Sequence, residues 1–313
     1  MAKVLVTGAA GKIGRALTAE LVACGHEVVG LYRSKRGADA AVTWHQADVT
    51  SPESYAAALA GCDAVIHLAV DFRREMMDVV NVQATRDLLK AAHEAGVRYF
   101  GFASSVVVYG SPPRREVNEQ TPTIDPAKPI TGQYLAEPFM LDYARTKVEA
   151  ERAIIANAAG MTIDIYRPTV VVTIPQLLES GDWGGARKAQ IAHRNTQYIT
   201  TVDVAAAIRH LMDRALAASP RGTAEIYNLA DATSGTYAEL LARAFAATGD
   251  SRFRVPLRLP ALADRAKDFL KYRNLSMRTP LGRLKVSNGK LVATGFILPL
   301  GLERGVEEAI GRK

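Results

Sequence analysis

Short apolar runs alternate with helical apolar repeats over the first 166 residues of the chain. A run such as "DAVIHLAV" is continuous and rich in β-branched residues, which is typical of a strand buried on both faces of a sheet. Between such runs, apolar residues recur at three- and four-residue spacing, which indicates amphipathic helices. The pattern predicts strands near residues 3–8, 26–33, 41–50, 62–70, 97–110 (with its following loop) and 161–168, and helices near 13–25, 51–61, 76–96 and 139–159.

This alternation predicts an α/β fold with a doubly wound parallel sheet, of the Rossmann type, because strands that alternate with helices pair in parallel through right-handed crossovers. After Pro168 the alternation loosens, and the last part of the chain is rich in Pro and Arg. We therefore expect a dinucleotide-binding domain in residues 1–166, with returns to its sheet at about 198–230, and a smaller substrate-binding lobe formed by residues 167–197 and 231–313.

The composition is that of a globular protein, with 48% apolar and 23% charged residues. We find no apolar run of the about 18 residues that a membrane span requires, and the strand pattern at the N-terminus leaves no room for a signal peptide. The two cysteines lie in no CxxC or Cys/His cluster, so we expect no metal site. So few cysteines suit a reducing cytoplasm, where we expect the protein.

The formal charge of +7 is concentrated in residues 251–290, which we term the basic segment. This segment contains eleven Lys and Arg residues and only two acidic residues, Asp264 and Asp268. One interpretation is a site for an anionic ligand or surface, and the other is a solvated, lid-like segment. Nucleic acid is not an expected partner, because the sequence has no reader motif and no aromatic residues interleaved with the basic ones.

The segment "TGAAGKIG" follows the first predicted strand and opens the first predicted helix. This order is the context in which a dinucleotide fingerprint binds a pyrophosphate. Gly8 permits a sharp turn, Gly11 lets the backbone approach the phosphates, and Gly14 allows the helix to pack closely on the strand. The free N–H groups of the helix N-terminus attract the phosphate. The sequence therefore predicts a dinucleotide cofactor.

The second predicted strand ends in "LYRSKR", without the Asp or Glu that usually bonds the ribose 2′-hydroxyl of NAD. Arg33 stands at its tip, followed by Lys35 and Arg36. A guanidinium matches the geometry of a phosphate, so Arg33 suits the 2′-phosphate of NADP(H). We therefore favour NADP(H) over NAD(H), while a solvated basic loop is the alternative interpretation.

The motif TGxxGxxG resembles that of the extended short-chain dehydrogenase/reductase superfamily, also called the NAD-dependent epimerase/dehydratase family. Further stretches are similar to landmarks of that family and follow in the same order. They lie between about residues 3 and 245 and comprise "ADVT" (47–50), "DAVIHLAV" (63–70), "NVQAT" (81–85), "SSVVVYG" (104–110), "YARTK" (143–147), "YRP" (166–168), "TVDVA" (201–205) and "IYNLA" (226–230).

The resemblance implies roles for individual residues. Asp48 and Val49 are expected to contact the adenine, Ala69 to lie along the cofactor, and Asn81 to provide a polar group on the cofactor side. Counting back from the Tyr of "VYG" selects Ser105 as the catalytic serine. The remaining cofactor contacts that the resemblance implies are Lys12, Ile13, Leu68, Val70, Ser104 and Pro168.

Tyr143 and Lys147 are four residues apart on a predicted helix and therefore share one face. Hydride transfer at a carbon that bears oxygen also requires a proton on that oxygen, and tyrosine can donate it if its pKa falls from about 10 toward neutrality. Lys147 is expected to lower the pKa of Tyr143 and to hold the nicotinamide ribose, since a neighbouring cation favours phenolate. Ser105 is expected to hydrogen-bond the substrate oxygen. The alternative interpretations are an ordinary surface pair for Tyr143 and Lys147 and a strand-end turn for Ser104 and Ser105.

Three functions compete at this point. The first is an NAD(P)(H)-dependent oxidoreductase acting on a secondary alcohol or ketone, with a Ser-Tyr-Lys site. The second is an NAD-dependent nucleotide-sugar epimerase or dehydratase whose diphosphate binds the basic segment. It is weakened because "TVVVTIPQ" follows "RP", where many such enzymes carry Asn and Gly-Pro. The third is a cofactor-sensing protein without catalysis, which need not keep Ser105, Tyr143 and Lys147.

Several expectations concern the surroundings of the site. The loop before Tyr143 is longer than is usual in the family, so its residues Tyr134, Glu137 and Phe139 are expected to shape a small-molecule substrate pocket. Trp183, in a glycine-rich loop, is a candidate substrate-loop anchor, and His67 is expected in the core. The resemblance also implies a homodimer formed through the helices at about 75–95 and 139–159.

Overall fold

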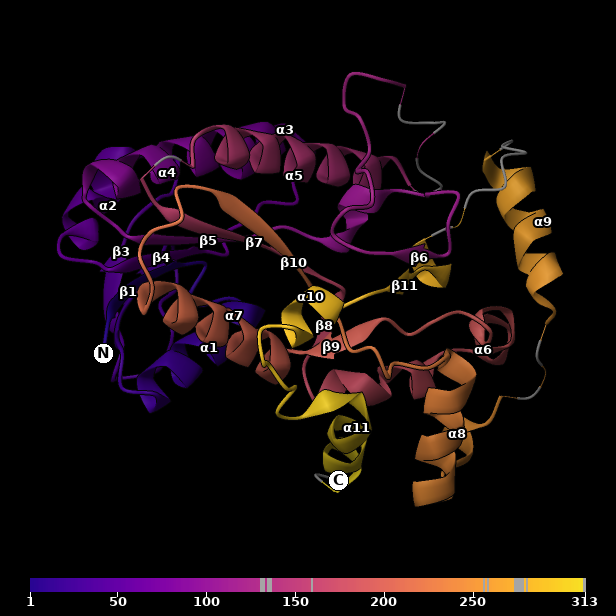
Figure 1. The fold of residues 1–313 in the computed structure, drawn as a ribbon. Coiled ribbons are helices and arrows are strands. Elements are labelled where there is room, and N and C mark those ends of the chain that lie inside the picture. Colours follow the sequence, from indigo (N-terminus) through magenta and orange to yellow (C-terminus); the bar gives the residue numbers. More distant parts are fainter. Residues whose placement is uncertain are drawn as a thin grey trace.

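A seven-stranded parallel sheet forms the centre of the molecule in the computed structural model, which describes residues 1–129, 133, 137–158, 160–255, 257, 259–272, 279 and 281–311. The strand order is β10-β7-β5-β4-β1-β2-β3, and each neighbouring pair is parallel (Figure 1). This confirms the predicted doubly wound fold. The strands are β1 (Lys3–Thr7), β2 (Glu27–Tyr32), β3 (Thr43–Gln46), β4 (Ala64–His67), β5 (Tyr99–Ala103), β7 (Thr162–Pro168) and β10 (Ala224–Leu229).

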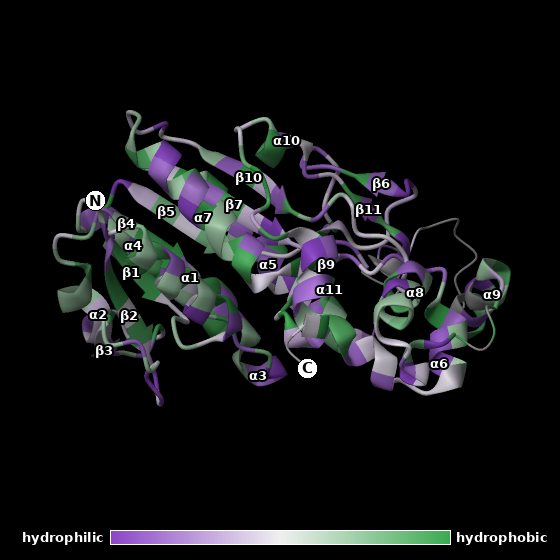
Figure 2. Cartoon of the chain, turned by 90° about the horizontal axis from the view of Figure 1, so that it is seen from below, coloured by the Kyte–Doolittle hydropathy of each residue, from purple (hydrophilic) through white to green (hydrophobic). Residues whose placement is uncertain are grey.

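Helices cover both faces of this sheet (Figure 1). One layer contains α1 (Lys12–Ala23) and α7 (Thr201–Leu216), which pack on each other, and the opposite layer contains α2 (Pro52–Leu59), α4 (Ala84–Glu94) and α5 (Pro138–Ala156). Figure 2 shows hydrophobic strands between helices in which hydrophobic and hydrophilic residues alternate. Each helix therefore buries one apolar stripe against the sheet, as the helical spacing in the sequence predicts.

The helix expected at 76–96 is interrupted. It consists of α3 (Arg74–Met77), a π-helical turn η1 (Asp78–Gln83) and α4. The turn contains Asn81, whose buried side chain bonds the backbone of Asp71 outside the helix. Single π-helical turns are frequent at functional sites, because they re-aim a side chain without ending the helix.

A second group of elements packs at one end of the sheet. Its own core contains Leu177, Tyr198, Leu241, Phe253 and Val306. Two small parallel sheets belong to this part of the chain, β8 (Val170–Val172) with β9 (Tyr198–Thr200) and β6 (Glu116–Val117) with β11 (Lys285–Val286). The helices are η4 (Pro175–Asp182), α6 (Gly185–Ile191), α8 (Tyr237–Thr248), η5 (Ser251–Phe253), α9 (Ala261–Tyr272), η6 (Leu281–Arg283) and α11 (Gly301–Gly311). The short helix α10 (Gly289–Val292) packs instead against β10 of the central sheet.

The strand order determines where a ligand fits. The chain proceeds from β1 to β2 and β3 on one side, and β4, β5 and β7 lie on the other side of β1. Doubly wound sheets bind ligands at such a reversal, in the crevice outside the carboxyl ends of the strands. The glycine turn, Arg33, the segment after His67 and Ser105 all follow the carboxyl ends of strands in this region.

Candidate active site

The glycine turn joins β1 to α1 with very little free space. Gly8 has φ +65, and a Cβ atom there would lie 2.9 Å from the Ala69 nitrogen. A Cβ atom at Gly14 would lie 2.2 Å from the Gly8 oxygen. Gly11 donates its N–H to the Gly8 oxygen at 2.9 Å. Gly11 is also the N-cap residue of α1, and no side chain caps this end of the helix. The uncovered N–H groups of the first turn are suited to a pyrophosphate.

The side chains of two predicted cofactor contacts, Lys12 and Ile13, contact other parts of the protein in this turn. The Lys12 ammonium donates to the Val171 oxygen at 2.9 Å and to Gln176 Oε1 at 3.3 Å, so it joins α1 to the lobe of β8 and η4. The Ile13 side chain packs against the apolar core beside α1. The backbone N–H groups of both residues lie in the first turn of α1, so both remain predicted phosphate contacts.

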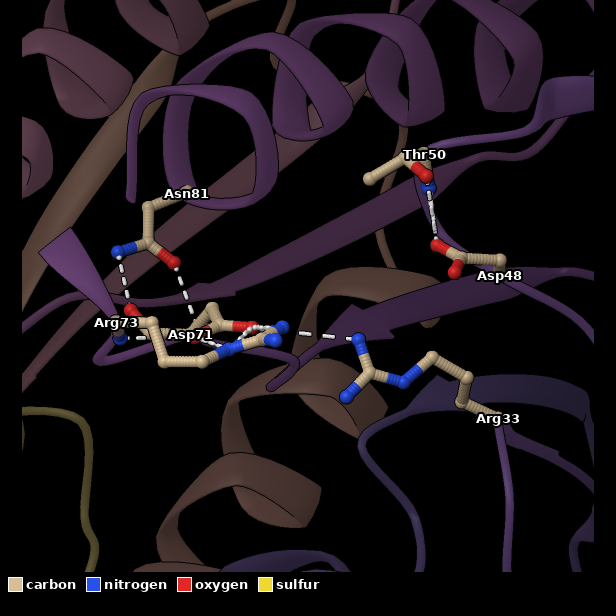
Figure 3. A network of polar contacts seen from close by, with 6 residues as sticks. All are labelled: Arg33, Asp48, Thr50, Asp71, Arg73 and Asn81. Carbon is tan, nitrogen blue, oxygen red and sulfur yellow. Dashed lines mark hydrogen bonds and ion pairs between the residues drawn. The ribbon is translucent and has the colours of Figure 1, made fainter. Parts of the chain in front are cut away.

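The ribose end contains an ion-pair cluster that includes an arginine absent from the sequence prediction (Figure 3). Asp71 accepts two short hydrogen bonds from Arg73, from Nη2 at 2.6 Å and from Nε at 3.0 Å. Arg33 Nη1 lies 4.0 Å from Asp71 Oδ2, and 58% of the Arg33 side chain is exposed. The Arg73 hydrogen bonds lower the pKa of Asp71 to about 2, although burial opposes this shift. Arg33 and Arg73 thus both lie within 4.0 Å of one carboxylate, which is charged at neutral pH.

Asp48 and Val49 follow β3 beside this cluster and are half-buried. Asp48 accepts hydrogen bonds from the backbone N–H and the hydroxyl of Thr50, at 2.9 and 2.8 Å. The Thr50 N–H contributes most to lowering the pKa of Asp48, and the charge of Arg33 contributes less. The Asp48 carboxylate therefore stays charged near the end of β2, where the adenosine of a dinucleotide is expected.

Thr7 and Asn81 position the segment after β4. The Thr7 hydroxyl accepts the N–H groups of Leu68 and Ala69, both at 3.1 Å. Asn81 accepts the Asp71 N–H at 2.9 Å and donates to the Asp71 oxygen at 3.0 Å. The Asn81 side chain is thus engaged with this segment, which also contains the half-buried Val70. Asn81 therefore positions the loop beside the glycine turn. The sequence motif around Asn81 did not by itself indicate this role.

His67 is a core residue, as predicted. Its ring nitrogens lie 2.7 Å from the Thr7 hydroxyl and 3.0 Å from the Thr85 hydroxyl. Burial, assisted by the charge of Lys147, lowers the pKa of His67 to about 3. A neutral histidine between two hydroxyl groups joins β4 to β1 and α4 and exposes no nitrogen for catalysis.

The structure brings Ser105, Tyr143 and Lys147 together beside the carboxyl end of β5. Ser105 begins the 3-10 helix η2 (Val106–Tyr109), and its hydroxyl accepts the Val107 N–H at 3.3 Å. Tyr143 lies on α5, where a hydrogen bond with Ser105 favours its phenolate while burial disfavours it. Burial is the larger effect and raises the pKa of Tyr143 above its usual value. The three side chains therefore converge with the phenol in its protonated form.

The Lys147 ammonium differs from expectation. It donates to the Ala103 oxygen at 2.7 Å and lies 5.9 Å from the centroid of the Tyr143 ring. Burial lowers the pKa of Lys147 to about 8, although the charge of Glu151 opposes this shift. The expected lowering of the Tyr143 pKa by Lys147 is not observed in this structure, because the ammonium is directed to a backbone carbonyl and the phenol is buried.

Ser104, predicted to face the cofactor, instead belongs to a buried ion-pair network. Its hydroxyl donates to Glu151 Oε1, and the Glu151 carboxylate pairs with Arg167 at 2.6 and 2.9 Å. The Arg167 guanidinium lies 4.9 Å from the centroid of the Tyr109 ring. Pro168, at the end of β7, is also buried. Glu151 therefore holds the Ser104 hydroxyl, and the network joins α5 to the carboxyl ends of β5 and β7.

The profile of the NAD dependent epimerase/dehydratase family matches residues 4–230 of the chain. The chain belongs to this family. Among curated relatives, sterol demethylase protein B of Methylococcus capsulatus is 33% identical over 179 residues, 54% of this chain and 51% of that protein. A 2-alkyl-3-oxoalkanoate reductase of Shewanella oneidensis is 25% identical over 282 residues, 85% of this chain and 69% of that protein. The chain spans only part of the length of these curated relatives. It covers 13% of a relative that is 36% identical and 51% of the sterol demethylase protein B, which is 33% identical.

Solved structures of the same superfamily share the fold. A short-chain dehydrogenase/reductase superfamily protein from Agrobacterium tumefaciens with bound NAD has a TM-score of 0.72 and 24% sequence identity, covering 99% of this chain and 96% of that chain. At this identity the likeness concerns the fold. Together with the family match, it confirms the resemblance that the ordered motifs indicate.

Trp183 is anchored within the lobe. Its ring lies 5.4 Å from the Tyr237 ring, and the Arg187 guanidinium lies 3.9 Å from the Trp183 ring centroid. These contacts attach the segment between η4 and α6 to α8. Tyr134, expected in the substrate pocket, lies outside the described residues. Glu137 and Phe139 flank the N-terminus of α5, where Lys271 of α9 pairs with Glu137.

Several described residues of the basic segment pair with acidic groups of the protein. Arg252 pairs with Asp182 and Asp250, and Lys290 lies 3.4 Å from Glu225. Lys285 likewise pairs with a glutamate of β6. Arg258, Arg273 and Arg278 lie outside the described residues. Among the helices that the structure describes, none has the length and apolar character needed to cross a membrane.

Proposed function

We propose that this chain is an NAD(P)(H)-dependent oxidoreductase that reduces a ketone to a secondary alcohol, or catalyses the reverse reaction, with Ser105, Tyr143 and Lys147 as the catalytic residues. The observation that carries this proposal is the convergence of these side chains at the carboxyl end of β5, next to the glycine turn. A turn in which a Cβ atom at Gly8 or Gly14 would meet backbone atoms is consistent with a dinucleotide held close to the chain.

When bound, the reduced nicotinamide supplies the hydride to the carbonyl carbon. Tyr143 donates its phenolic proton to the carbonyl oxygen as the C=O π bond breaks, and the Ser105 hydroxyl holds that oxygen by a hydrogen bond. Lys147, whose ammonium lies at the carboxyl end of β5, binds the nicotinamide ribose. Burial raises the pKa of Tyr143, so the phenol is protonated at neutral pH. The phenol therefore carries the proton that ketone reduction requires, while the hydrogen bond with Ser105 favours the phenolate that its transfer leaves.

We further propose a preference for NADP(H), with Arg33 and Arg73 as the phosphate ligands. Each guanidinium is more than half exposed beside Asp71, so each can rotate toward a 2′-phosphate. Residues 167–197 and 231–313 remain our proposed substrate lobe. A homodimer through the helices at about 75–95 and 139–159, and a cytoplasmic location, also remain proposals.

The nucleotide-sugar epimerase or dehydratase is the alternative within the same family. It would place a diphosphate against arginines of the basic segment. Arg252 is instead held between Asp182 and Asp250, and the Arg254 guanidinium lies on the Phe245 ring at 4.8 Å. These contacts support the oxidoreductase over the diphosphate-binding function.

Tyr143→Phe tests the proposal. The variant should lose at least about 100-fold in kcat for ketone reduction, the size expected when a general acid is removed. Its affinity for NADPH, measured by fluorescence titration, should stay within about twofold, since the phenol ring is retained. Lost turnover with intact cofactor binding is the expected result. Retained turnover would refute the acid role of Tyr143, and protein that retains non-exchanging NAD during purification would favour the epimerase.

A further inference from the structure

The exposed Phe72 ring borders the Tyr143 ring, and the exposed Phe139 ring borders Phe72 in turn. The Phe72 ring centroid lies 5.2 Å from that of Tyr143 and 6.0 Å from that of Phe139. Phe72 is 52% exposed and Phe139 is 37% exposed, although phenylalanine is normally among the buried residue types. We propose that Phe72 and Phe139 bind the hydrocarbon part of the substrate, so that the enzyme acts on ketones or alcohols whose reacting carbon carries a bulky apolar group.

Contacts on both sides hold these rings in place. Phe72 lies between Asp71 and Arg73, whose side chains form the ion pair of the ribose end. Phe139 lies in the first turn of α5, next to Glu137, which pairs with Lys271. A surface that is fixed before binding loses little conformational entropy when a ligand covers it. The two rings therefore form a prepared apolar wall beside the proposed proton donor.

A second ion pair joins the elements that carry the rings. Arg74 Nη2 of α3, two residues after Phe72, lies 2.6 Å from Asp142 Oδ2 of α5, three residues after Phe139. The segment after β4 and the start of α5 are thereby tied together on the side of Tyr143. This contact links the two elements on which the rings stand.

The charges near the rings suit an apolar group better than a diphosphate. Arg74 is neutralised by Asp142, and Arg145 lies within 3.0 Å of both Asp78 and Glu149. A diphosphate would have to separate such pairs. A hydrocarbon gains free energy simply by covering the Phe72 and Phe139 rings, because apolar surface leaves water.

The inference rests on the proposed function, since it assigns the substrate of the same Tyr143 site. The test uses a series of ketones that share one reaction and differ in apolar size, namely acetone, 2-octanone, acetophenone and 2-acetylnaphthalene, with dihydroxyacetone as a polar member. Wild-type kcat/KM, followed through NADPH absorbance, should rise along the apolar series. Phe72→Ala and Phe139→Ala should each lower the ratio of kcat/KM for 2-acetylnaphthalene to that for acetone by about tenfold, mainly through KM.

Ile297→Ala is the matched control, because Ile297 is an exposed apolar side chain (84%) on the segment between α10 and α11. It should leave the ratio unchanged. Thermal unfolding should show that all three variants fold, since each altered side chain is exposed. An unchanged ratio in both phenylalanine variants, or a preference for dihydroxyacetone, would overturn the inference while leaving ketone reduction intact.

A second measurement separates this inference from the proposed reaction. Binding of 2-naphthol to the protein with its cofactor, measured by calorimetry, requires no turnover. Wild type and Ile297→Ala should bind it alike, and Phe139→Ala should bind it about tenfold more weakly. If no ketone is reduced but 2-naphthol binding depends on Phe139, the proposed reaction fails and the apolar site stands. If 2-naphthol binding is independent of both rings, the apolar site fails.

Discussion

The Lys147 ammonium donates a hydrogen bond to the Ala103 oxygen at 2.7 Å, which ties the middle of α5 to the end of β5. Both elements carry proposed catalytic groups, Tyr143 on α5 and Ser105 just after β5. The contact therefore determines how the two hydroxyl groups meet. It also places a cation in a buried position without a carboxylate in direct contact, which explains why the pKa of Lys147 falls to about 8.

Lys147 gives the first prediction, which concerns stability and pH. Its pKa is about 8 in the folded protein against a usual value of 10.5, so between these values the unfolded chain binds more protons than the folded chain. The free energy of unfolding of the cofactor-free wild type should therefore rise with pH from about 8 to 10, relative to Lys147→Met, which cannot titrate. Urea unfolding of both proteins across this range measures the difference. A constant difference would show that the ammonium is solvated.

Arg33 leads to the second prediction, on cofactor choice. Arg33→Ala should raise the Kd for NADPH about tenfold, the effect of losing one charge-assisted phosphate contact, and should change the Kd for NADH less than about twofold. Arg152→Ala is the control, because Arg152 has a similar exposed fraction and lies on α5. Fluorescence titration with the two cofactors measures the ratio. Equal weakening of NADPH and NADH, or tighter binding of NADH by the wild type, would contradict the NADP(H) preference.

The buried pair of Glu151 and Arg167 supports a third prediction. Arg167→Met leaves a buried carboxylate without its cation, which should lower the free energy of unfolding by about 3–5 kcal/mol. The double variant Arg167→Met with Glu151→Met should recover much of this loss, because no unpaired charge remains. The exposed pair of Lys90 and Glu94 is the control, where Glu94→Ala should change stability by less than about 1 kcal/mol. A similar loss of stability in Arg167→Met and Glu94→Ala would argue against the burial of the pair of Glu151 and Arg167.

The glycine turn provides the fourth prediction. A Cβ atom at Gly14 would meet the Gly8 oxygen at 2.2 Å, so Gly14→Ala must displace the backbone. The variant should lose about 1–3 kcal/mol of stability and bind either cofactor more weakly. Gly184→Ala is the matched control, since Gly184 has φ −59 and a Cβ atom there would meet no atom within 4 Å. Equal stability and cofactor affinity in the two variants would refute the tight packing of the turn.

The local parts of the site were predictable because they depend on neighbours in sequence. The turn at Gly8 requires a positive φ, and Tyr143 and Lys147 share a face through helical periodicity alone. The sequence predicted Asn81 as a polar residue on the cofactor side. It did not predict the contact of Asn81 with Asp71, because this contact depends on a π-helical turn. Apolar periodicity does not reveal such a turn.

Contacts between distant segments account for what the sequence did not show. Ser104 faces Glu151 across 47 residues, and Lys12 reaches the Val171 oxygen across 159 residues. Asp71 and Arg73, an i, i+2 pair that begins four residues after the end of β4, were the local signal available for the ribose-end cluster. The pKa of Tyr143 also depended on burial, which no spacing in the sequence indicates.

The sequence by itself determined the parallel sheet, the glycine turn and the family, because hydrophobic periodicity and short motifs encode local backbone conformation. Only the tertiary structure decided which side chains face the crevice and in which charge state. It placed Phe72 between the rings of Tyr143 and Phe139, Arg33 and Arg73 near Asp71, and the Lys147 ammonium on the Ala103 oxygen. The physical reason is that burial and electrostatic environment arise where strands far apart in sequence end at the same edge of the sheet.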